Sequence, residues 1–360
     1  MTTELRHSRK TGACIVAFAA FLMSSVFAAE VSSQTNFFEG KTIRIIQGRQ
    51  PGGTGDMRTR AVVHFLSKYI PGNPKILFEY MPGGGGRKAA NYLYNAARPD
   101  GLTIANIGAG FITNAVLGAS GVQYDFDKMV FLGTGNSKSS YVFVTRRGAG
   151  FDNLEKLLQA KGVRVGALSV GHDIYINARI FAWLLGLQDP KFVPGYSGPE
   201  LDQAVIAGEV DARVNITDTV VQRTSHWIKD KLVDFHSVFE IPSGYRLDHP
   251  AFAGLPSLQS FAKTEIDKKI LEMTRTFRLV GSPYLLGPGV PQERVKTLQD
   301  AFRKVFTDPQ LAEIWEKFTG APPSPLLPEE QDQTIKRLPR DPETVKTFKR
   351  LAGPGPLPGH

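Results

Sequence analysis

The sequence predicts an α/β fold in two domains, and three observations support this prediction. Between Thr42 and about Gly110, an apolar strand-like stretch, a glycine-rich turn and a helical pattern follow one another three times. The same order of elements restarts at Val163. About 330 residues remain after the N-terminal segment discussed below, more than a single hydrophobic core comfortably supports. Strands that alternate with helices at this spacing indicate parallel pairing with right-handed crossovers.

The first domain is expected to contain the two most glycine-rich turns of the chain. The expected strands are 42–46, 75–80 and 102–107, and the expected helices are 56–69 and 88–97. The first turn is Pro51-Gly52-Gly53-Thr54-Gly55-Asp56, and the second is Pro82-Gly83-Gly84-Gly85-Gly86-Arg87. Each turn lies between a strand and a helix.

Two apolar stretches between residues 131 and 146 flank a polar segment, 136–140, which we interpret as the crossing into the second domain. The later elements are expected to be strands 163–168, 192–194 and 208–214, helices 174–185 and 200–207, a return segment at 277–280, and helices that begin at 291 and span 309–318. The proline-rich tail after Ala321 is expected to wrap the surface or fray. These boundaries predict a first domain from 29–140 and 278–345, a second domain at 141–277, and a tail at 346–360.

The first 28 residues have the pattern of an export signal. Basic residues precede an apolar stretch at 13–23, and Val26-Phe27-Ala28 places small residues before an expected cleavage site after Ala28. The apolar stretch is shorter than the roughly 20 residues that a membrane span needs. Cys14 lies inside this segment, so the exported chain has no cysteine for a disulfide, a thiol nucleophile or a thiolate metal site. We therefore expect a periplasmic protein.

The charge pattern argues against nucleic acid as a partner. The formal net charge is +9, but lysine and arginine are spread along the chain instead of clustering with aromatic residues. A modest positive excess suits small anions better. The seven histidines show no metal-ligand spacing, and the glycine turns match neither the dinucleotide nor the Walker pattern. We expect no metal and no cofactor.

The two glycine turns are the strongest candidates for a binding site. Glycine lets the backbone approach a ligand closely, and the following helix directs N–H groups and a positive dipole end at the turn. Such turns can hold an anion. Arg49 and Arg87 stand at the two turns and could add cationic side chains. Asp56 is expected more often to cap its helix than to contact a ligand.

Ser169 and His172 allow an alternative interpretation, a serine hydrolase. The nucleophile elbow requires Gly-x-Ser-x-Gly, but Ala167 stands two residues before Ser169. A turn with a helix start explains the same residues, and we expect no enzymatic activity.

Several segments in order resemble the substrate-binding proteins of tripartite tricarboxylate transporters, the TctC or Bug family. The resemblance covers nearly all of the chain after the signal. It rests on Ile43-Arg44-Ile45-Ile46, the turn at 51–56, Met81 to Gly86, Ala97-Arg98-Pro99-Asp100-Gly101-Leu102-Thr103-Ile104, Tyr196-Ser197-Gly198, Gly208-Glu209-Val210-Asp211 and Leu286-Gly287-Pro288-Gly289-Val290-Pro291.

The resemblance implies a type II periplasmic-binding-protein fold, with mainly parallel sheets flanked by helices and a ligand cleft between the domains. It implies a protein that captures a small organic acid, a mono- or dicarboxylate or an aromatic acid, for membrane transporter subunits. We expect a monomer. A ligand sensor for a signalling receptor is the alternative role. The implied ligand residues are those of the two turns together with Ser169, Gly171, Tyr196, Ser197, Gly198 and Asn215. We add His172, next to Gly171, as a candidate ligand residue.

The chain departs from the family pattern at three places. Gly48-Arg49-Gln50 stands where proline and an aromatic residue are usual, Arg87-Lys88 where small or polar residues are commoner, and Asn215 where aspartate is frequent. The extra positive charge leads to the hypothesis of a dianionic or aromatic acid.

Overall fold

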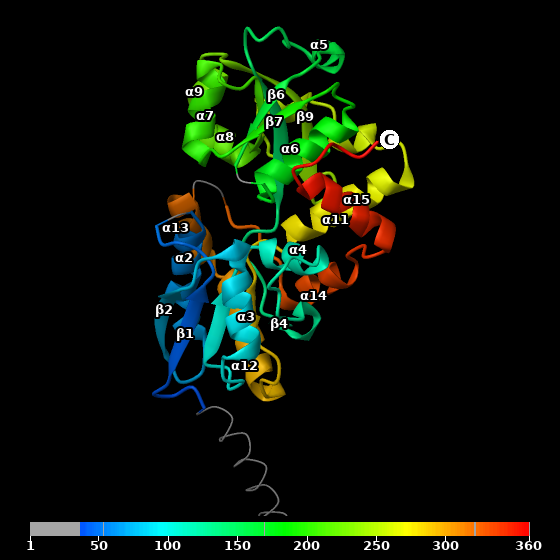
Figure 1. Cartoon of the computed structure of the whole chain (residues 1–360). Coiled ribbons are helices and arrows are strands. Elements are labelled where there is room, and N and C mark those ends of the chain that lie inside the picture. Colours follow the sequence, from blue (N-terminus) through cyan, green and yellow to red (C-terminus); the bar gives the residue numbers. More distant parts are fainter. Residues whose placement is uncertain (1–36, 53, 169, 320–321, 360) are drawn as a thin grey trace, which may run out of the picture.

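The computed structural model describes residues 37–52, 54–168, 170–319 and 322–359. Within them the chain forms two five-stranded sheets flanked by helices, and each sheet is the centre of one lobe (Figure 1). The predicted α/β fold with two domains is confirmed. The predicted signal peptide and the predicted ligand residues Gly53 and Ser169 lie outside the described residues.

The first sheet has the strand order β2-β1-β3-β10-β4. Strand β1 pairs in parallel with β2 and β3, while β10 is antiparallel to both β3 and β4. Its strands are β1 (Thr42–Gln47), β2 (Lys75–Tyr80), β3 (Thr103–Asn106), β4 (Val130–Phe131) and β10 (Tyr284–Leu286).

Helices bury both faces of this sheet, which explains why its central strands are almost continuously apolar. Ile43 and Ile45 pack with α2, α12 and α13, whereas Ile46 packs with α3 and α4 on the other face. The helices of this lobe are α2 (Thr54–Tyr69), η1 (Gly84–Gly86), α3 (Arg87–Asn95), α4 (Gly110–Val116), η2 (Phe126–Lys128), α12 (Gln292–Phe306) and α13 (Pro309–Thr319).

The second sheet has the order β7-β6-β8-β5-β9. Its strands are β5 (Ser139–Arg146), β6 (Arg164–Ala167), β7 (Lys191–Pro194), β8 (Ala212–Ile216) and β9 (Val233–Ile241). The helices between Leu154 and Leu279 are α5 (Leu154–Gln159), α6 (Asp173–Leu184), α7 (Gly198–Ala207), α8 (Thr217–Arg223), α9 (Ser225–Lys229), α10 (Pro250–Ala253), η3 (Leu258–Phe261) and α11 (Glu265–Leu279).

Both sheets are mixed rather than mainly parallel, which corrects the expectation. Strand β6 is parallel to β7 and β8, but β5 is antiparallel to β8 and β9. The parallel pairs belong to the strand–turn–helix units that the sequence pattern reveals. The antiparallel pairs involve strands that enter a sheet from a crossing or from the C-terminal part, where no such unit exists.

The structure also differs from the expectation after residue 321, where two helices replace the expected wrapping or frayed tail. They are α14 (Pro328–Lys336) and α15 (Pro342–Ala352). Helix α15 packs against α6 and α11, on the side of the molecule where the lobes meet (Figure 1). One apolar cluster therefore continues from α3 and α4 through α11 and α15 to α6. Among the described helices, none has the length and apolar character of a membrane span.

Candidate functional site

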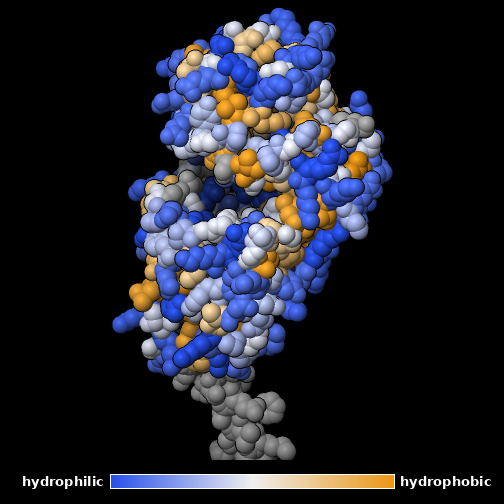
Figure 2. All heavy atoms as spheres, viewed as in Figure 1, coloured by the Kyte–Doolittle hydropathy of each residue, from blue (hydrophilic) through white to orange (hydrophobic). Residues whose placement is uncertain are grey.

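The two glycine-rich turns lie next to each other at one edge of the first sheet. Because β1, β2 and β3 are parallel neighbours, their carboxyl ends share that edge. The backbone N–H of Met81 donates to Gln47 O at 2.8 Å, and that of Gly48 donates to Asn106 O at 3.0 Å. Figure 2 shows a hollow between the two lobes, with hydrophilic residues inside it. We call this hollow the cleft.

The second turn is a run of four glycines with positive φ, at 138°, 58°, 62° and 94° for Gly83 to Gly86. Side chains other than glycine are disfavoured in this conformation. The turn uses its own N–H groups: Gly86 N–H donates to Gly83 O at 3.1 Å, and Arg87 N–H donates to Gly84 O. The start of α3 therefore offers fewer free N–H donors than the sequence analysis expects.

Asp56 braces the first turn. Its carboxylate accepts hydrogen bonds from Gln47 Nε2 at 2.6 Å, Gly52 N–H at 2.9 Å, Tyr80 O–H at 2.9 Å and Arg60 Nε at 3.1 Å. Burial disfavours the ionised form, but these four donors outweigh it and hold the pKa of Asp56 below its usual value. The Asp56 oxygens are thus engaged by the turn and by the strands and helix around it, and the carboxylate holds these groups together.

Arg49 lies against Gly55 in the same turn. A Cβ at position 55 would meet Arg49 Nη1 at 2.1 Å, so a larger residue there would displace the guanidinium from its present position. The Nη2 atom of Arg49 is buried and has no hydrogen-bond partner among the described residues. Burial lowers the pKa of Arg49, although Tyr284 and Asp56 oppose this effect. Arg49 is therefore a largely buried cation whose Nη2 can still donate a hydrogen bond.

Arg58, in the first turns of α2, is the centre of a cluster that the sequence analysis missed. Its Nε atom is buried without a hydrogen-bond partner among the described residues, and its guanidinium carbon lies 5.7 Å from the centre of the Trp315 ring. Burial lowers the pKa of Arg58 to about 10, with further lowering by Arg278 and Arg49 and opposition from Asp218. Arg58 is therefore within electrostatic range of Arg278, Asp218 and Arg49.

The cluster joins both lobes. Arg49 and Arg58 belong to the first lobe, Arg278 lies in the last turn of α11, and Asp218 lies in the first turn of α8 beside the second sheet. Arg58 thus interacts electrostatically with charged groups from separate parts of the chain, and one of them, Asp218, belongs to the second lobe.

Tyr141 extends the cluster into the second sheet. Its O–H donates to Asp173 Oδ2 at the start of α6. Burial raises the pKa of Tyr141 and Asp173 raises it further, while Arg278 opposes them. A buried, protonated phenol therefore lies between Asp173 and Arg278.

Asn215, a predicted ligand residue, lies in the second lobe and keeps an unused hydrogen-bond donor. Its Nδ2 is buried without a partner among the described residues, while its Oδ1 accepts from Ile216 N–H at 2.9 Å. The register pairs Asn215 with Val142, so its side chain lies on the opposite face of the sheet from Tyr141.

Four other predicted ligand residues of the second lobe form helix starts. His172 caps α6, because its Nδ1 accepts from Ile174 N–H at 3.1 Å, and burial lowers the pKa of His172 against the influence of Asp173. Gly171 precedes this cap with φ of 80°. Ser197 caps α7, of which Gly198 is the first residue, in a reciprocal arrangement with Glu200.

Tyr196 and Arg87, two further predicted ligand residues, contact Glu209 and the loop at Gly121. The Tyr196 O–H points to Glu209 Oε2 at 3.5 Å. A Cβ on Gly121 would lie 3.6 Å from Arg87 Nε, so the Arg87 side chain rests on the loop after α4. In the first turn, Pro51 and Gly52 are exposed, and Thr54 and Gly55 begin α2. Arg49 and Arg278 thus act electrostatically on Arg58, whereas Arg87 is not among the groups that shift the pKa of Arg58.

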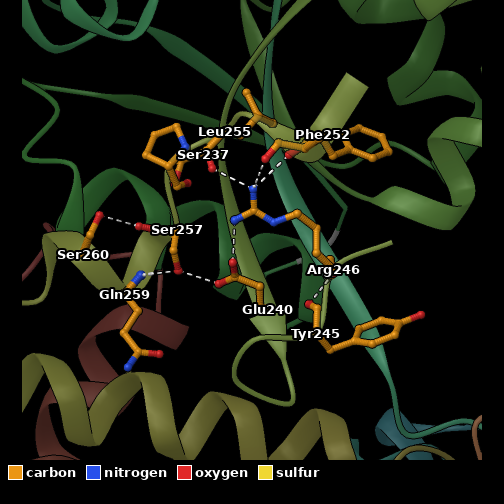
Figure 3. Close-up of polar contacts among 12 residues, drawn as sticks. Ser237, Glu240, Tyr245, Arg246, Phe252, Leu255, Ser257, Gln259 and Ser260 are labelled. Carbon is orange, nitrogen blue, oxygen red and sulfur yellow. Dashed lines mark hydrogen bonds and ion pairs between the residues drawn. The ribbon is translucent and has the colours of Figure 1, made fainter. Parts of the chain in front are cut away.

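A braced loop after β9 brings Tyr245 to the same cluster. Glu240 accepts hydrogen bonds from Arg246 Nη2 and Ser257 Oγ, both at 2.5 Å (Figure 3). Arg246 Nη1 donates in turn to the carbonyl oxygens of Phe252, Ala253 and Leu255.

This network fixes the loop beside the crossing segment. Ser140 Oγ donates to Tyr245 O at 3.1 Å, and Lys138 Nζ lies 5.8 Å from the centre of the Tyr245 ring. Burial raises the pKa of Tyr245, and Asp218 adds to this effect. Tyr245 is therefore within electrostatic range of Asp218, the carboxylate that also acts on Arg58.

Sequence reasoning missed the residues that reach the cluster from outside the glycine turns: Arg58, Tyr141, Asp173, Asp218, Tyr245 and Arg278. One signal was present. Met57-Arg58-Thr59-Arg60 places two arginines in the first turns of a helix, where cations oppose the helix dipole. Among the described residues, no group of three histidine, cysteine or acidic side chains could hold a metal ion.

No protein-family model matches the chain, and no curated protein matches its sequence. Solved structures share its fold. A TctC solute-binding protein from Polaromonas, without ligand, has 17% identity and a TM-score of 0.61, covering 86% of this chain and 97% of its own. MatC from Rhodopseudomonas palustris with bound malate has 18% identity and a TM-score of 0.57, covering 87% and 99%.

Another R. palustris protein, Rpa4515 with adipate, has 13% identity and a TM-score of 0.57, covering 87% of this chain and 96% of its own. These similarities extend over both lobes. The chain therefore has the fold of TctC and Bug solute-binding proteins.

Proposed function

We propose that this chain is an extracytoplasmic solute-binding protein of the TctC or Bug type, which captures a small carboxylic acid in the cleft. The observation that carries this proposal is the pair of buried nitrogens, Arg49 Nη2 and Arg58 Nε, that have no partner among the described residues. A carboxylate accepts hydrogen bonds from guanidinium groups with matching geometry. The malate and adipate in structures of the same fold support this ligand class.

The two-lobed architecture supplies the mechanism. Arg58 and Asp218 belong to different lobes, and the Asp218 carboxylate opposes the lowering of the Arg58 pKa by burial. A ligand that contacts Arg58 can therefore also contact the second lobe, and it binds best when the lobes are close together. Such a ligand shifts the population of conformations toward the closed form.

The closed form would be delivered to the membrane subunits of a tripartite tricarboxylate-type transporter. The predicted export signal and the shared fold support this role. Presentation of the closed form to a signalling receptor is the alternative, because the same cleft serves both. A serine hydrolase is disfavoured, because His172 Nδ1 is already the acceptor for Ile174 N–H and caps α6. We therefore propose a non-enzymatic protein.

A thermal-shift screen of the purified protein against mono-, di- and tricarboxylates and aromatic acids tests this function. A ligand that binds only the folded state adds about 2.7 kcal/mol at a hundredfold excess over its dissociation constant. Small-angle X-ray scattering should then show a smaller radius of gyration with the best ligand. If no acid raises the melting temperature, and mass spectrometry of gently unfolded protein releases no co-purified acid, the proposal is wrong.

A further inference from the structure

Two segments cross between the lobes, 132–138 and 280–283, and in the second of them the attachment of the chain changes at Gly281. The N–H of Gly281 donates to Arg278 O in α11 at 3.0 Å, whereas its carbonyl oxygen accepts from Ala109 N–H of the first lobe at 3.0 Å. Its φ of 66° lies in the region that favours glycine. A change of angle between the lobes therefore turns the backbone at this residue.

Helices α11 and α14 pack against each other but are attached to different lobes. In α11, Arg275 Nη2 donates to Gln259 Oε1 at 2.9 Å, and its guanidinium carbon lies 5.4 Å from the centre of the Phe239 ring in β9. These contacts attach α11 to the second lobe. Helix α14 is attached to the first lobe, because Arg303 Nη2 in α12 donates to Glu329 Oε2 at 3.0 Å.

Gln331 of α14 connects the two lobes with one amide group. Its side chain is 0% exposed. The Oε1 atom accepts from Gly133 N–H at 3.1 Å, and Nε2 donates to Val280 O at 2.9 Å. Gly133 extends the first sheet, since its carbonyl oxygen accepts from Tyr284 N–H of β10 at 2.9 Å. Val280 follows the last residue of α11 and precedes Gly281, so the amide spans the point where the backbone turns.

We propose that Gln331 is a positioning residue of the hinge, which holds the lobes at the angle that leaves the cleft hollow (Figure 2). When the lobes close, the backbone turns at Gly281 and the Val280 carbonyl moves away from Gln331 Nε2. The hydrogen bond between them therefore opposes closure. Because the amide is buried, it changes ligand affinity only through the population of the closed form. This inference rests on the proposed function, capture of an acid by lobe closure.

Gln331→Met tests this role, because it roughly keeps the side-chain volume and removes both hydrogen bonds. A neutral hydrogen bond changes an equilibrium constant by roughly two- to tenfold, so acid affinity should rise by that factor while the melting temperature falls. Calorimetry with succinate and with benzoate measures the affinity. A residue with a merely structural role would lower the melting temperature and leave binding unchanged or weaker, and either result would overturn the inference.

Thr274→Val is the matched control for the loss of a buried hydrogen bond. Thr274 Oγ1 donates to Ile270 O at 2.7 Å, so this bond stays within α11 and does not connect the lobes. The variant should keep the acid affinity of the wild type. An affinity gain equal to that of Gln331→Met would overturn the inference, because any loosening of α11 would then have the same effect.

Glu329→Gln is a milder variant that leaves the Gln331 amide in place. The side chains of Arg303 and Glu329 are 35% and 50% exposed, so the fold should tolerate the loss of this ion pair. Helix α14 can then follow α11 as the lobes close, and acid affinity should rise by about twofold. Asp332→Asn breaks an ion pair with Lys336 inside α14 and should change nothing. Equal affinities of Glu329→Gln and the wild type would overturn the role of α14 as the anchor of Gln331.

A distance measurement tests the hinge without any ligand. The chain has no cysteine besides Cys14, so Glu313→Cys in α13 and Lys229→Cys in α9 can carry nitroxide labels on the exported protein. Both positions are exposed, and the two helices belong to different lobes (Figure 1). Pulsed electron paramagnetic resonance should show a larger population of short distances when Gln331→Met is added. Identical distance distributions with and without Gln331→Met would overturn the inference.

The outcomes also separate this inference from the proposed function. If succinate or benzoate binds the wild type and Gln331→Met alike, with unchanged label distances, the function stands and the hinge role of Gln331 fails. If Gln331→Met shifts the label distances but no acid binds, the hinge role stands and the proposed function fails. Tighter acid binding together with shorter label distances supports both.

Discussion

Arg179 donates a hydrogen bond from Nη2 to the carbonyl oxygen of Gly355 at 2.6 Å, which ties helix α6 to the C-terminal end of the chain. The same guanidinium donates from Nε to Leu351 O at 2.8 Å and lies 4.8 Å from the centre of the Phe192 ring. Only 2% of Arg179 is exposed. The segment after α15 is thus part of the packed structure, attached to the second lobe.

Arg179→Met should lower the free energy of unfolding by about 3 kcal/mol, because carbonyl oxygens at the end of α15 lose a charged donor in a buried place. Urea unfolding measures this loss. Carboxypeptidase should also remove the tail faster from the variant. Lys346→Gln changes an exposed cation on α15 and serves as the control. Equal tail cleavage in wild type and Arg179→Met would show that Arg179 does not anchor the tail.

The Gly83–Gly86 turn should tolerate substitution much less at Gly86 than the first turn does at Gly52. Both glycines have positive φ, 94° and 82°, so alanine costs about 1–2 kcal/mol of strain at either position. At Gly86 the new Cβ would also meet Ile107 Cγ2 at 2.3 Å, whereas at Gly52 nothing lies within 4 Å. Gly86→Ala should therefore destabilise the protein at least twice as much in urea unfolding. Equal losses would show that the turn can shift away from Ile107.

The fold was largely predictable because strand–turn–helix units leave a local pattern. Strand β2 has the predicted limits, and α7 ends at the predicted residue Ala207. The antiparallel strands and α15 escaped prediction, since their positions depend on contacts with distant segments such as α6 and α11.

The candidate site was predictable only where its residues are neighbours in sequence. Arg49 stands in a glycine turn and was recognised there. Arg58 and Arg278 are 220 residues apart in the chain, and only the folded lobes bring them within electrostatic range of each other. His172 and Ser197 were predicted as ligand residues from their place in the sequence, but their side chains accept hydrogen bonds from backbone N–H groups at the starts of α6 and α7. A motif shows which residues are near in sequence, but not which hydrogen bonds they already make.

Asp56→Asn should destabilise the protein and weaken ligand binding together. The substitution removes the charge that pairs with Arg60 and replaces one acceptor oxygen by a donor, in a side chain that is only 2% exposed. We expect a loss of roughly 2–4 kcal/mol, and a lower ligand affinity because the turn that carries Arg49 is braced by this carboxylate.

Tyr80→Phe is the graded comparison, since it removes only one of the four donors to Asp56, at 2.9 Å. It should cost about 1 kcal/mol and leave affinity nearly unchanged. Urea unfolding and calorimetry measure the two effects. If Asp56→Asn kept full affinity, the brace would be irrelevant to the position of Arg49.

His236 should make the protein less stable as the pH falls from neutral to about 4. The side chain is buried, its Nε2 lies 2.7 Å from Thr145 Oγ1, and its Nδ1 has no partner among the described residues. Burial lowers the pKa of His236 from 6.5 to about 4, against the opposing influence of Asp234 and Asp152. The folded protein thus holds this ring neutral where the unfolded chain protonates it.

The sign follows from proton binding in the two states. Between pH 6.5 and about 4 the unfolded chain binds more protons, so the contribution of His236 is fully present above pH 6.5 and is lost as the pH falls toward 4. The loss amounts to about 3 kcal/mol. His236→Gln removes the titration, so its unfolding free energy should change less over this range than that of the wild type. His64→Gln alters an exposed histidine and should retain the full slope. Parallel pH profiles for wild type and His236→Gln would mean that other groups cause the acid sensitivity.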